Sequence, residues 1–541
     1  MINRIVKHHR LFFLLILIIA LGAFLRFYNL NWGAPFYFHP DERNIAGLIS
    51  SLPAQIDYTH FLKGTFSYGN FISNAVFFIK AVLSSLLTTS GFSDPFAQSV
   101  ILLRFLSAIS SLITILIVFF IGYRLKNLLT GIVSAMLTTF STGLIQAAHF
   151  GVYESFFTLM SVSLFIISML YVKSKSFFYI FISIIIISVS SASKINSAIF
   201  ILIPFSLFSI ISIKQKLALY KIVLQLFLLL LFFMTLTLFL SPYYATEEFR
   251  DLLVYERNLL TGALPVFYTG EFLNIIPILF QLTHIYPFLI NPLLTLLFVP
   301  SFLYVFYDGV KNKNINYILL SIFFIILFFP SALLFAKWTR YMVPTLPFIY
   351  LIIAIALEDF LRKKVVVIKY SILSIIISIN IVFAVSYFIT AFVNQDTRIE
   401  ASLWAQENIS IYSSSVSEVY DMGIVPFNPY LKNISLFNFY DLDPVSSYNS
   451  IQLQNLLSSS EYIILPSQRI LKTRLVNQNR FPNGYNFYSG LLSGKLGYQK
   501  VYETSCDIFC KIIYLGDPVF SYETTASVFE RPNVFIFKKI K

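Results

Sequence analysis

The chain has 541 residues, of which 57% are hydrophobic and 12% are charged, about half of the roughly 25% charge of an ordinary soluble domain. Apolar runs of about 18 residues or more recur through positions 1–393, which is typical of membrane-spanning helices. The composition predicts a polytopic membrane protein. It excludes a soluble enzyme, a disordered chain and a disulfide-rich secreted module.

The formal net charge of +13 belongs to residues 1–393, because residues 394–541 hold as many acidic as basic side chains. These positive charges flank membrane helices, so we expect no nucleic-acid partner, which would need a basic face on a soluble domain. Arg4, Lys7 and Arg10 precede the first apolar run, and no small-residue cleavage site follows it. We therefore expect a retained first helix rather than a removed signal peptide.

Twelve apolar runs are candidate membrane helices. If all of them cross, the basic loops between them face outward, against the positive-inside rule. If the run Phe71–Leu87 lies along the membrane instead, every basic loop turns inward. Eleven crossings then place the N-terminus in the cytoplasm and the C-terminal tail outside an inner (plasma) membrane. The runs are Leu11–Leu30, Phe71–Leu87, Val100–Gly122, Leu128–Ala148, Val152–Val172, Phe177–Ser193, Ile195–Ile213, Ile222–Leu240, Ile285–Tyr307, Ile315–Ala336, Tyr341–Leu357 and Tyr370–Val393.

The sequence therefore divides into a membrane domain, 1–393, whose first outer loop, 31–99, carries juxtamembrane helices, and an outer domain, 394–541. The second part is long enough for one small α/β domain. Its opening stretch, Asp396–Ile409, is predicted to be an amphipathic helix. Its predicted strands are Tyr462–Leu465, Lys511–Leu515 and Val534–Phe537.

Two cysteines, Cys506 and Cys510, lie in this outer domain. A turn between them would allow a disulfide, whereas a straight strand would hold them about 13 Å apart. The sequence leaves both states open.

The first outer loop places His39, Asp41 and Glu42 shortly after the first helix. Two adjacent carboxylates beside a histidine, close to the membrane surface, can supply a general base. The alternative is a solvated loop in which Asp41 caps a helix that begins near Glu42. On the first interpretation, Asp41 and Glu42 are candidate catalytic residues.

A second outer cluster contains His149 and Glu154, where one predicted helix ends and the next begins. Glu154 falls inside an apolar pattern near the outer boundary, where an ionisable group is costly and indicates a function. The alternative is a side chain that snorkels to the interface.

A third outer group contains Lys337, Arg340 and Tyr341. Because cations on the outer face run against the topological bias, we expect them to hold the phosphate of an anionic lipid. Arginine offers a bidentate fork for that phosphate and lysine a point charge. The alternative is ordinary interfacial anchoring. Lys194 and Arg104 are further outward cations with the same candidate role.

Motifs for nucleotide hydrolysis, dinucleotide redox chemistry and zinc proteolysis are absent. The triplet Asp441-Leu442-Asp443 resembles the D-x-D of metal-dependent nucleotide-sugar enzymes, but a turn before Pro444 explains it better. The six histidines and two cysteines have no metal-ligand spacing, so no metal site is predicted.

In chain order, these residues resemble the polyprenyl-phosphate-dependent glycosyltransferases with the GT-C fold. The resemblance is to glycosyltransferase family 39 and allied groups, in particular the protein O-mannosyltransferases and the lipid A aminoarabinose transferases. Each matching feature is short, and together they extend from the first outer loop into the tail. They are Asp41-Glu42, the aromatic-rich stretch 66–70, the helix start 103–108, His149 with Glu154, the stretch 193–196, Arg340-Tyr341 with Pro344 and Pro347, and the tail from Thr397 through Trp404 to Asn408.

The resemblance implies an all-α GT-C membrane domain of about eleven transmembrane helices, followed by an extracytoplasmic α/β domain. It implies that Asp41 is the base that deprotonates the acceptor, and that Glu154 stands where relatives often have Asp. Outer cations hold the donor phosphate, a role that fits Arg340, Lys337, Lys194 and Arg104.

The implied donor is a sugar on polyprenyl phosphate in the surrounding membrane lipid. The implied acceptor is a protein, a lipid or a cell-surface glycan. No nucleotide is needed, and a divalent cation is left open as a cofactor.

The competing interpretation is a polytopic transporter or flippase of lipid-linked saccharides. Against it stand the lack of inverted-repeat symmetry, the scarcity of charges inside the helices, and an outer domain that a flippase does not need. A third interpretation, a ligase or polymerase of surface polysaccharide, shares the lipid-linked donor but typically has its key residues in a long late outer loop.

Overall fold

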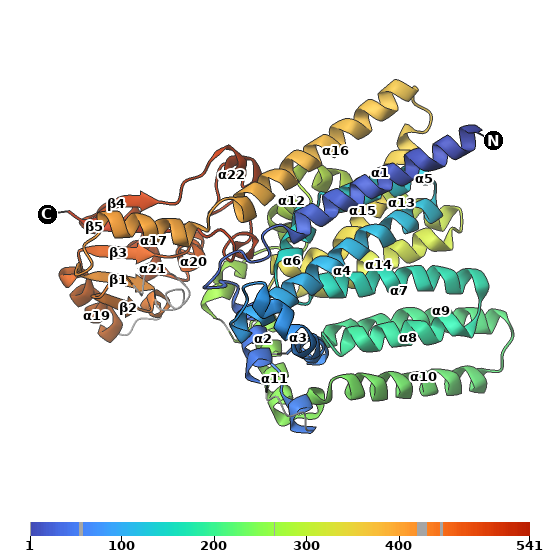
Figure 1. Ribbon diagram of the computed structural model, residues 1–541, viewed down its shortest axis with the longest axis horizontal. Coiled ribbons are helices and arrows are strands. Elements are labelled where there is room, and N and C mark those ends of the chain that lie inside the picture. Colours follow the sequence, from blue (N-terminus) through green and yellow to red (C-terminus); the bar gives the residue numbers. More distant parts are fainter. Residues whose placement is uncertain are drawn as a thin grey trace.

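The computed structural model describes residues 2–52, 58–65, 67–264, 266–418, 430–443 and 447–540. Long helices form a bundle, and a small domain with a β-sheet lies at one end of it (Figure 1). The N-terminal end of α1 lies at the other end of the bundle. The structure confirms the predicted helical membrane part and the C-terminal α/β domain.

The bundle consists of apolar helices that lie lengthwise beside one another (Figure 1). Nine helices in the described part of the chain, α3 among them, are long and apolar enough to cross a membrane, and α5 with α6 forms a tenth, bent by 52°. The apolar part of α1 and α8 are shorter. The bundle elements are α1 (Ile2–Phe27), α4 (Pro95–Leu125), α5 (Leu128–Thr139), α6 (Thr142–His149), α7 (Glu154–Ser174), α8 (Phe177–Ser191), α9 (Leu202–Lys214), α10 (Leu219–Leu240), α12 (Tyr286–Leu289), α13 (Pro292–Lys311), α14 (Ile315–Leu333), α15 (Leu346–Leu361) and α16 (Val366–Phe388).

The helix α3 (Phe71–Thr89) is apolar like the bundle helices but runs in another direction. It is seen nearly end-on in Figure 1, whereas the bundle helices run across the view. It packs against α2 and α4. That the run Phe71–Leu87 lies along the membrane, with eleven segments crossing it, stays a prediction.

The helices differ in how much of their apolar surface the protein buries. Only 22% of the apolar stretch of α10 is buried, against 83% of the stretch that contains α15. Large exposed apolar surfaces such as that of α10 are unstable in water and suit lipid. The chain is therefore an integral membrane protein, with α15 in its interior and α10 at its periphery.

The bend between α5 and α6 leaves backbone carbonyls without helical partners inside the bundle. Arg26 of α1 is fully buried and donates to the carbonyls of Thr138 and Thr139 at 3.0 and 3.1 Å. It also donates to the Ser111 hydroxyl at 2.8 Å. Because an unsatisfied carbonyl in the membrane is costly, these bonds stabilise the bend.

Short elements gather at the end of the bundle that faces the C-terminal domain (Figure 1). They connect the long helices and contribute most of the residues of the candidate site. They are α2 (Pro40–Ser51), η1 (Tyr58–Leu62), η2 (Ile195–Ile201), η3 (Pro242–Ala245), α11 (Glu247–Thr261), η4 (Phe267–Phe272), η5 (Gln281–Ile285), η6 (Thr339–Thr345) and η7 (Ile389–Val393).

The C-terminal domain has a five-stranded sheet in the order β2-β1-β3-β5-β4. β1 pairs in parallel with β2 and β3, and β5 pairs antiparallel with β3 and β4. Its elements are α17 (Thr397–Asn408), β1 (Ser415–Glu418), β2 (Ile434–Phe437), η8 (Phe439–Leu442), α19 (Ser447–Ser459), β3 (Tyr462–Leu465), α20 (Arg469–Val476), α21 (Pro482–Leu492), β4 (Tyr498–Glu503), α22 (Ile508–Ile513), η9 (Thr524–Ala526) and β5 (Phe535–Lys539).

One predicted strand of this domain is wrong. Lys511–Leu515 forms the end of α22 and the turn after it, because Asp507 caps a helix there by accepting from the Cys510 amide at 2.8 Å. The same turn brings Cys506 and Cys510 to a Cα–Cα distance of 5.2 Å, and they form a disulfide. The predicted strands Tyr462–Leu465 and Val534–Phe537 correspond to β3 and β5.

The crosswise position of α3 predicts that its two flanks lie on the same side of the membrane. In whole cells, Lys63→Cys before α3 and Ser90→Cys after it should both react with an impermeant maleimide. Lys313→Cys, in a basic loop at the far end of the bundle, is the control and should react only after permeabilisation. The two native cysteines form a disulfide, so they do not react with the maleimide and need not be replaced. Labelling of the two α3 flanks from opposite sides would show that α3 crosses.

Candidate functional site

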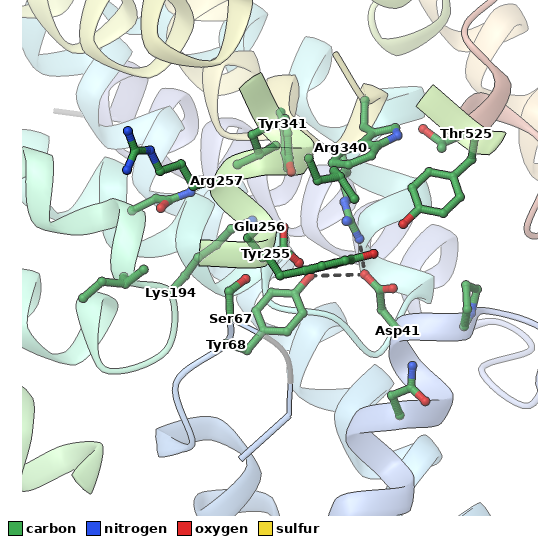
Figure 2. A pocket seen from close by; sticks show the side chains of 18 of the residues that line it. Asp41, Ser67, Tyr68, Lys194, Tyr255, Glu256, Arg257, Arg340, Tyr341 and Thr525 are labelled. Carbon is green, nitrogen blue, oxygen red and sulfur yellow. Dashed lines mark hydrogen bonds and ion pairs between the residues drawn. The ribbon is translucent and has the colours of Figure 1, made fainter. Parts of the chain in front are cut away.

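A cavity of about 420 Å³ lies between the end of the bundle and the C-terminal domain (Figure 2). Short elements at the end of the bundle, chiefly α2, α11 and η6, form most of its wall, and α20 and the segment 523–529 of the C-terminal domain complete it. The residues that line it are Pro40, Asp41, Asn44, Ser67, Tyr68, Lys194, Ile195, Asn196, Leu253, Tyr255, Glu256, Arg257, Leu259, Leu260, Tyr268, Trp338, Arg340, Tyr341, Arg469, Glu523, Thr524, Thr525 and Phe529.

Asp41 and Arg340 form an ion pair in this cavity, although 299 residues separate them (Figure 2). The Tyr68 hydroxyl also donates to Asp41 Oδ2 at 3.3 Å. Burial by itself would raise the pKa of Asp41, but the Arg340 guanidinium outweighs it and lowers that pKa. Asp41 is therefore an ionised carboxylate at neutral pH and can accept a proton.

The first turn of α2 leaves the Asp41 side chain free for the cavity. The helix begins at Pro40 and is capped by His39, whose Nδ1 accepts from the Glu42 amide at 3.4 Å. The alternative in which Asp41 caps this helix is therefore wrong. Burial lowers the pKa of His39, so its ring is neutral and can act as this acceptor.

A second ion pair, between Lys194 and Glu154, lies beside the first. Lys194 Nζ is 2.9 Å from Glu154 Oε1, and it lies 5.9 and 5.6 Å from the ring centres of Tyr68 and Tyr341. Glu154 is the first residue of α7 and is 1% exposed. Lys194 lines the cavity, whereas Glu154 is not among the residues that line it.

Backbone contacts hold Tyr68 next to Lys194. The two residues form an antiparallel bridge, and the Gly69 amide donates to the Ser193 carbonyl at 3.0 Å. A Cβ on Gly69 would lie 2.0 Å from the Ala192 carbonyl oxygen, so only glycine allows this close approach. The aromatic-rich stretch of the first loop thus reaches the cavity through Tyr68.

The C-terminal domain fixes the backbone beside Arg340. Glu523 Oε2 accepts from the amide and the hydroxyl of Thr339 at 2.9 and 2.6 Å. Burial raises the pKa of Glu523 to about 8, helped by the neighbouring carboxyl of Glu271. Arg340 itself lies over the rings of Trp338 and Tyr341, with its Cζ at 5.4 and 5.7 Å from their centres.

Glu42 and Arg104, two predicted site residues, lie outside the cavity lining and bind each other. Both are fully buried, and Arg104 Nη2 and Nε donate to the two Glu42 oxygens at 2.6 and 2.8 Å. The Gly151 amide donates to Glu42 at 2.6 Å, and a Cβ there would be 2.8 Å from Leu103. This pair fastens α2 to α4 and to the turn before α7.

Two further candidates also lie outside the lining. His149 is buried against Phe392 at 3.7 Å between ring centres, and its ring nitrogens meet the backbone carbonyls of Ile145 and Tyr28 at 2.9 and 3.0 Å. Lys337 is 3% exposed, and its ammonium donates to the carbonyls at the end of α14. Of the predicted cations, the structure therefore brings Arg340 and Lys194 to the cavity.

Several lining residues carried no signal in the sequence. Tyr255, Glu256 and Arg257 lie on α11, whose exposed face looks like an ordinary solvated helix. Arg469 and Phe529 come from the C-terminal domain and reach the cavity only through folding. Asp443 of the D-x-D triplet accepts from the amides of residues 483 and 484, which is a structural role.

The described residues contain no group of three or more His, Cys, Asp or Glu side chains that could hold a metal ion.

The buried Glu42–Arg104 pair predicts a large effect on stability when one partner is neutralised. Glu42→Gln leaves the Arg104 charge without its partner and should lower the free energy of unfolding by about 3–5 kcal/mol, measured by unfolding in detergent micelles. Glu247→Gln is the matched control, because Glu247 pairs with Arg250 on the surface, with side chains 90% and 67% exposed. It should change stability by less than about 1 kcal/mol. Similar small losses in both variants would contradict this role.

Comparison with solved structures finds similarity to the archaeal oligosaccharyltransferase AglB from Archaeoglobus fulgidus in complex with an inhibitory peptide and a dolichol-phosphate. The identity is 13%, the TM-score is 0.50, and the match covers 99% of this chain and 89% of that one. ArnT from Cupriavidus metallidurans bound to undecaprenyl phosphate matches with 10% identity and a TM-score of 0.47, covering 97% of each chain. No protein-family model and no curated protein matches the sequence. The AglB match covers the membrane part and the C-terminal domain together, so this chain has the GT-C fold that the sequence resemblance predicts.

Proposed function

We propose that the protein is a membrane glycosyltransferase that moves a hexosyl or pentosyl group from a polyprenyl-phosphate donor to a protein, lipid or cell-surface glycan acceptor. The observation that carries the proposal is the placement of an ionised carboxylate, Asp41, and a guanidinium, Arg340, on one cavity wall at the end of the membrane bundle. Aromatic side chains, among them Tyr68, Tyr255 and Tyr341, line the same cavity, as is common for small-molecule sites.

The cavity belongs on the outer face in this proposal. The basic loops after α4, α7, α9, α13 and α15 lie at the bundle end opposite the cavity (Figure 1). The positive-inside rule assigns such loops to the cytoplasm. The N-terminus is then cytoplasmic, and the C-terminal domain lies outside, in an oxidising space that suits the disulfide.

Asp41 acts as the general base in the proposed reaction. It takes the proton of an acceptor hydroxyl or amine while that oxygen or nitrogen bonds to the anomeric carbon of the donor sugar. The bond between this carbon and the phosphate oxygen breaks, and polyprenyl phosphate leaves with the electron pair. Arg340 and Lys194 stabilise the charge that grows on the phosphate. Glu154 keeps Lys194 in place for this role.

The known ligands of the two similar structures support the choice of donor. AglB was solved with a dolichol-phosphate, and ArnT was solved with undecaprenyl phosphate. Both ligands are polyprenyl phosphates, which a cavity at the end of a membrane bundle can receive from the lipid.

The test is release of polyprenyl phosphate from a labelled lipid-linked sugar by the purified protein, with acceptor extract and with or without added Mg²⁺. Asp41→Asn should lower the transfer rate by about 10²–10⁴-fold, because the amide cannot accept the proton. Asp251→Asn, an exposed acid on α11 outside the cavity lining, is the control and should transfer at the wild-type rate. Transport of intact lipid-linked saccharide without sugar release would instead identify a transporter.

A further inference from the structure

Each predicted phosphate-binding cation that lines the cavity already holds an acid of the protein. Arg340 pairs with Asp41 (Figure 2). Lys194 pairs with Glu154. A carboxylate and a phosphate are alternative ligands for the same guanidinium fork. A donor phosphate that enters the cavity therefore has to compete with these acids.

The two pairs differ in how easily a ligand can reach them. The Asp41–Arg340 pair is open to the cavity, with side chains 21% and 28% exposed. The Lys194–Glu154 pair is more enclosed, with Lys194 at 14% and Glu154 at 1%. A phosphate can therefore replace Asp41 on Arg340 more easily than it can separate Lys194 from Glu154.

Both members of the open pair have other contacts that keep them in place after an exchange. Arg340 lies over the rings of Trp338 and Tyr341, which hold a guanidinium independently of Asp41. Asp41 keeps the Tyr68 hydroxyl as a hydrogen-bond donor at 3.3 Å. The exchange then needs only a small side-chain movement and no movement of the helices.

We propose that the donor phosphate displaces the Asp41 carboxylate from the Arg340 guanidinium, so that binding of the donor itself releases the catalytic base. This inference rests on the proposed function and adds an order to it, in which the donor binds before Asp41 becomes active. Asp41 is then a competitor of the donor as well as the base.

The charge environment of Asp41 explains why this order matters. In the pair, Arg340 lowers the pKa of Asp41, and a carboxylate with a lowered pKa is a weaker base. When a phosphate neutralises Arg340, the desolvation of Asp41 is no longer outweighed, and its basicity rises. The base is therefore strong only when a phosphate occupies Arg340.

The test is equilibrium binding of undecaprenyl phosphate to the full-length protein in nanodiscs, without any acceptor. Asp41→Asn should bind this lipid about three- to tenfold more tightly than the wild type, because the amide does not compete for Arg340. Arg340→Gln should bind it more weakly, and adding Asp41→Asn to Arg340→Gln should give no further tightening. Since His39 caps α2, Asp41→Asn should fold. Asp41→Ala removes the same competitor and is the second variant.

Glu256→Gln is the matched control for a general effect of charge. Glu256 lines the same cavity, and its field reaches Arg340, but the ion pair of Arg340 is with Asp41. If the phosphate replaces Asp41 on Arg340, Glu256→Gln should tighten undecaprenyl phosphate binding much less than Asp41→Asn. Equal tightening in both variants, or weaker binding by Asp41→Asn and Asp41→Ala, would overturn the exchange.

Failure of the proposed function gives a different result. A wild-type protein that neither binds undecaprenyl phosphate nor releases it from a sugar donor contradicts both proposals. A wild-type protein that binds and transfers, with no tightening in Asp41→Asn, contradicts the exchange alone.

Discussion

The buried ion pair between Glu42 and Arg104 is the contact on which the geometry of the cavity depends. Its two charges are fully desolvated, so the pair is stable only because both carboxylate oxygens are bonded and Arg104 also donates to the carbonyls of Leu30 and Trp32. These bonds fix the first turn of α2 to α4 and to the loop after α1. The Asp41 side chain, one residue before Glu42, is thereby directed into the cavity.

The other wall of the cavity depends on the C-terminal domain. Glu523 holds the backbone of Thr339 next to Arg340, and Phe529 packs on the ring of His39, which caps α2, at 4.4 Å between ring centres. The buried Glu530 accepts from Gln146 and Tyr387 of the bundle at 2.8 Å each. One short segment of the C-terminal domain therefore contacts both backbone regions that carry Asp41 and Arg340. This gives the C-terminal domain a direct part in the geometry of the site.

Much of this architecture could be predicted from the sequence, because the membrane imposes strong and simple constraints. Apolar length and the side of the basic loops predict eleven crossings with the run Phe71–Leu87 along the membrane, and α3 does run in another direction than the bundle helices. The acids and cations of the segments predicted to be outside indicated Asp41, Arg340 and Lys194. The different roles of Asp41 and Glu42 could not be predicted, because the two acids look equivalent in the sequence. Neighbours on a helix point about 100° apart, so Asp41 faces the cavity and Glu42 faces the protein interior.

The parts that could not be predicted depend on tertiary contacts. Lys511–Leu515 has the composition of a strand, but the cap from Asp507 and the disulfide next to it fix a helix. Glu523 and Phe529 lie far along the chain from Asp41, and no pattern in the sequence connects them to it. Lys337 and Arg340 are three residues apart, yet the end of α14 binds the Lys337 ammonium while Arg340 turns into the cavity.

The most direct test of the central claim is a structure of the wild-type protein determined with undecaprenyl phosphate in a lipid nanodisc. We expect the phosphate in the cavity described here, with its oxygens within hydrogen-bond distance of the Arg340 guanidinium and the Asp41 carboxylate released from Arg340 but still beside Tyr68. A phosphate bound elsewhere, with Asp41 and Arg340 still paired, would contradict the assignment of this cavity as the site of sugar transfer.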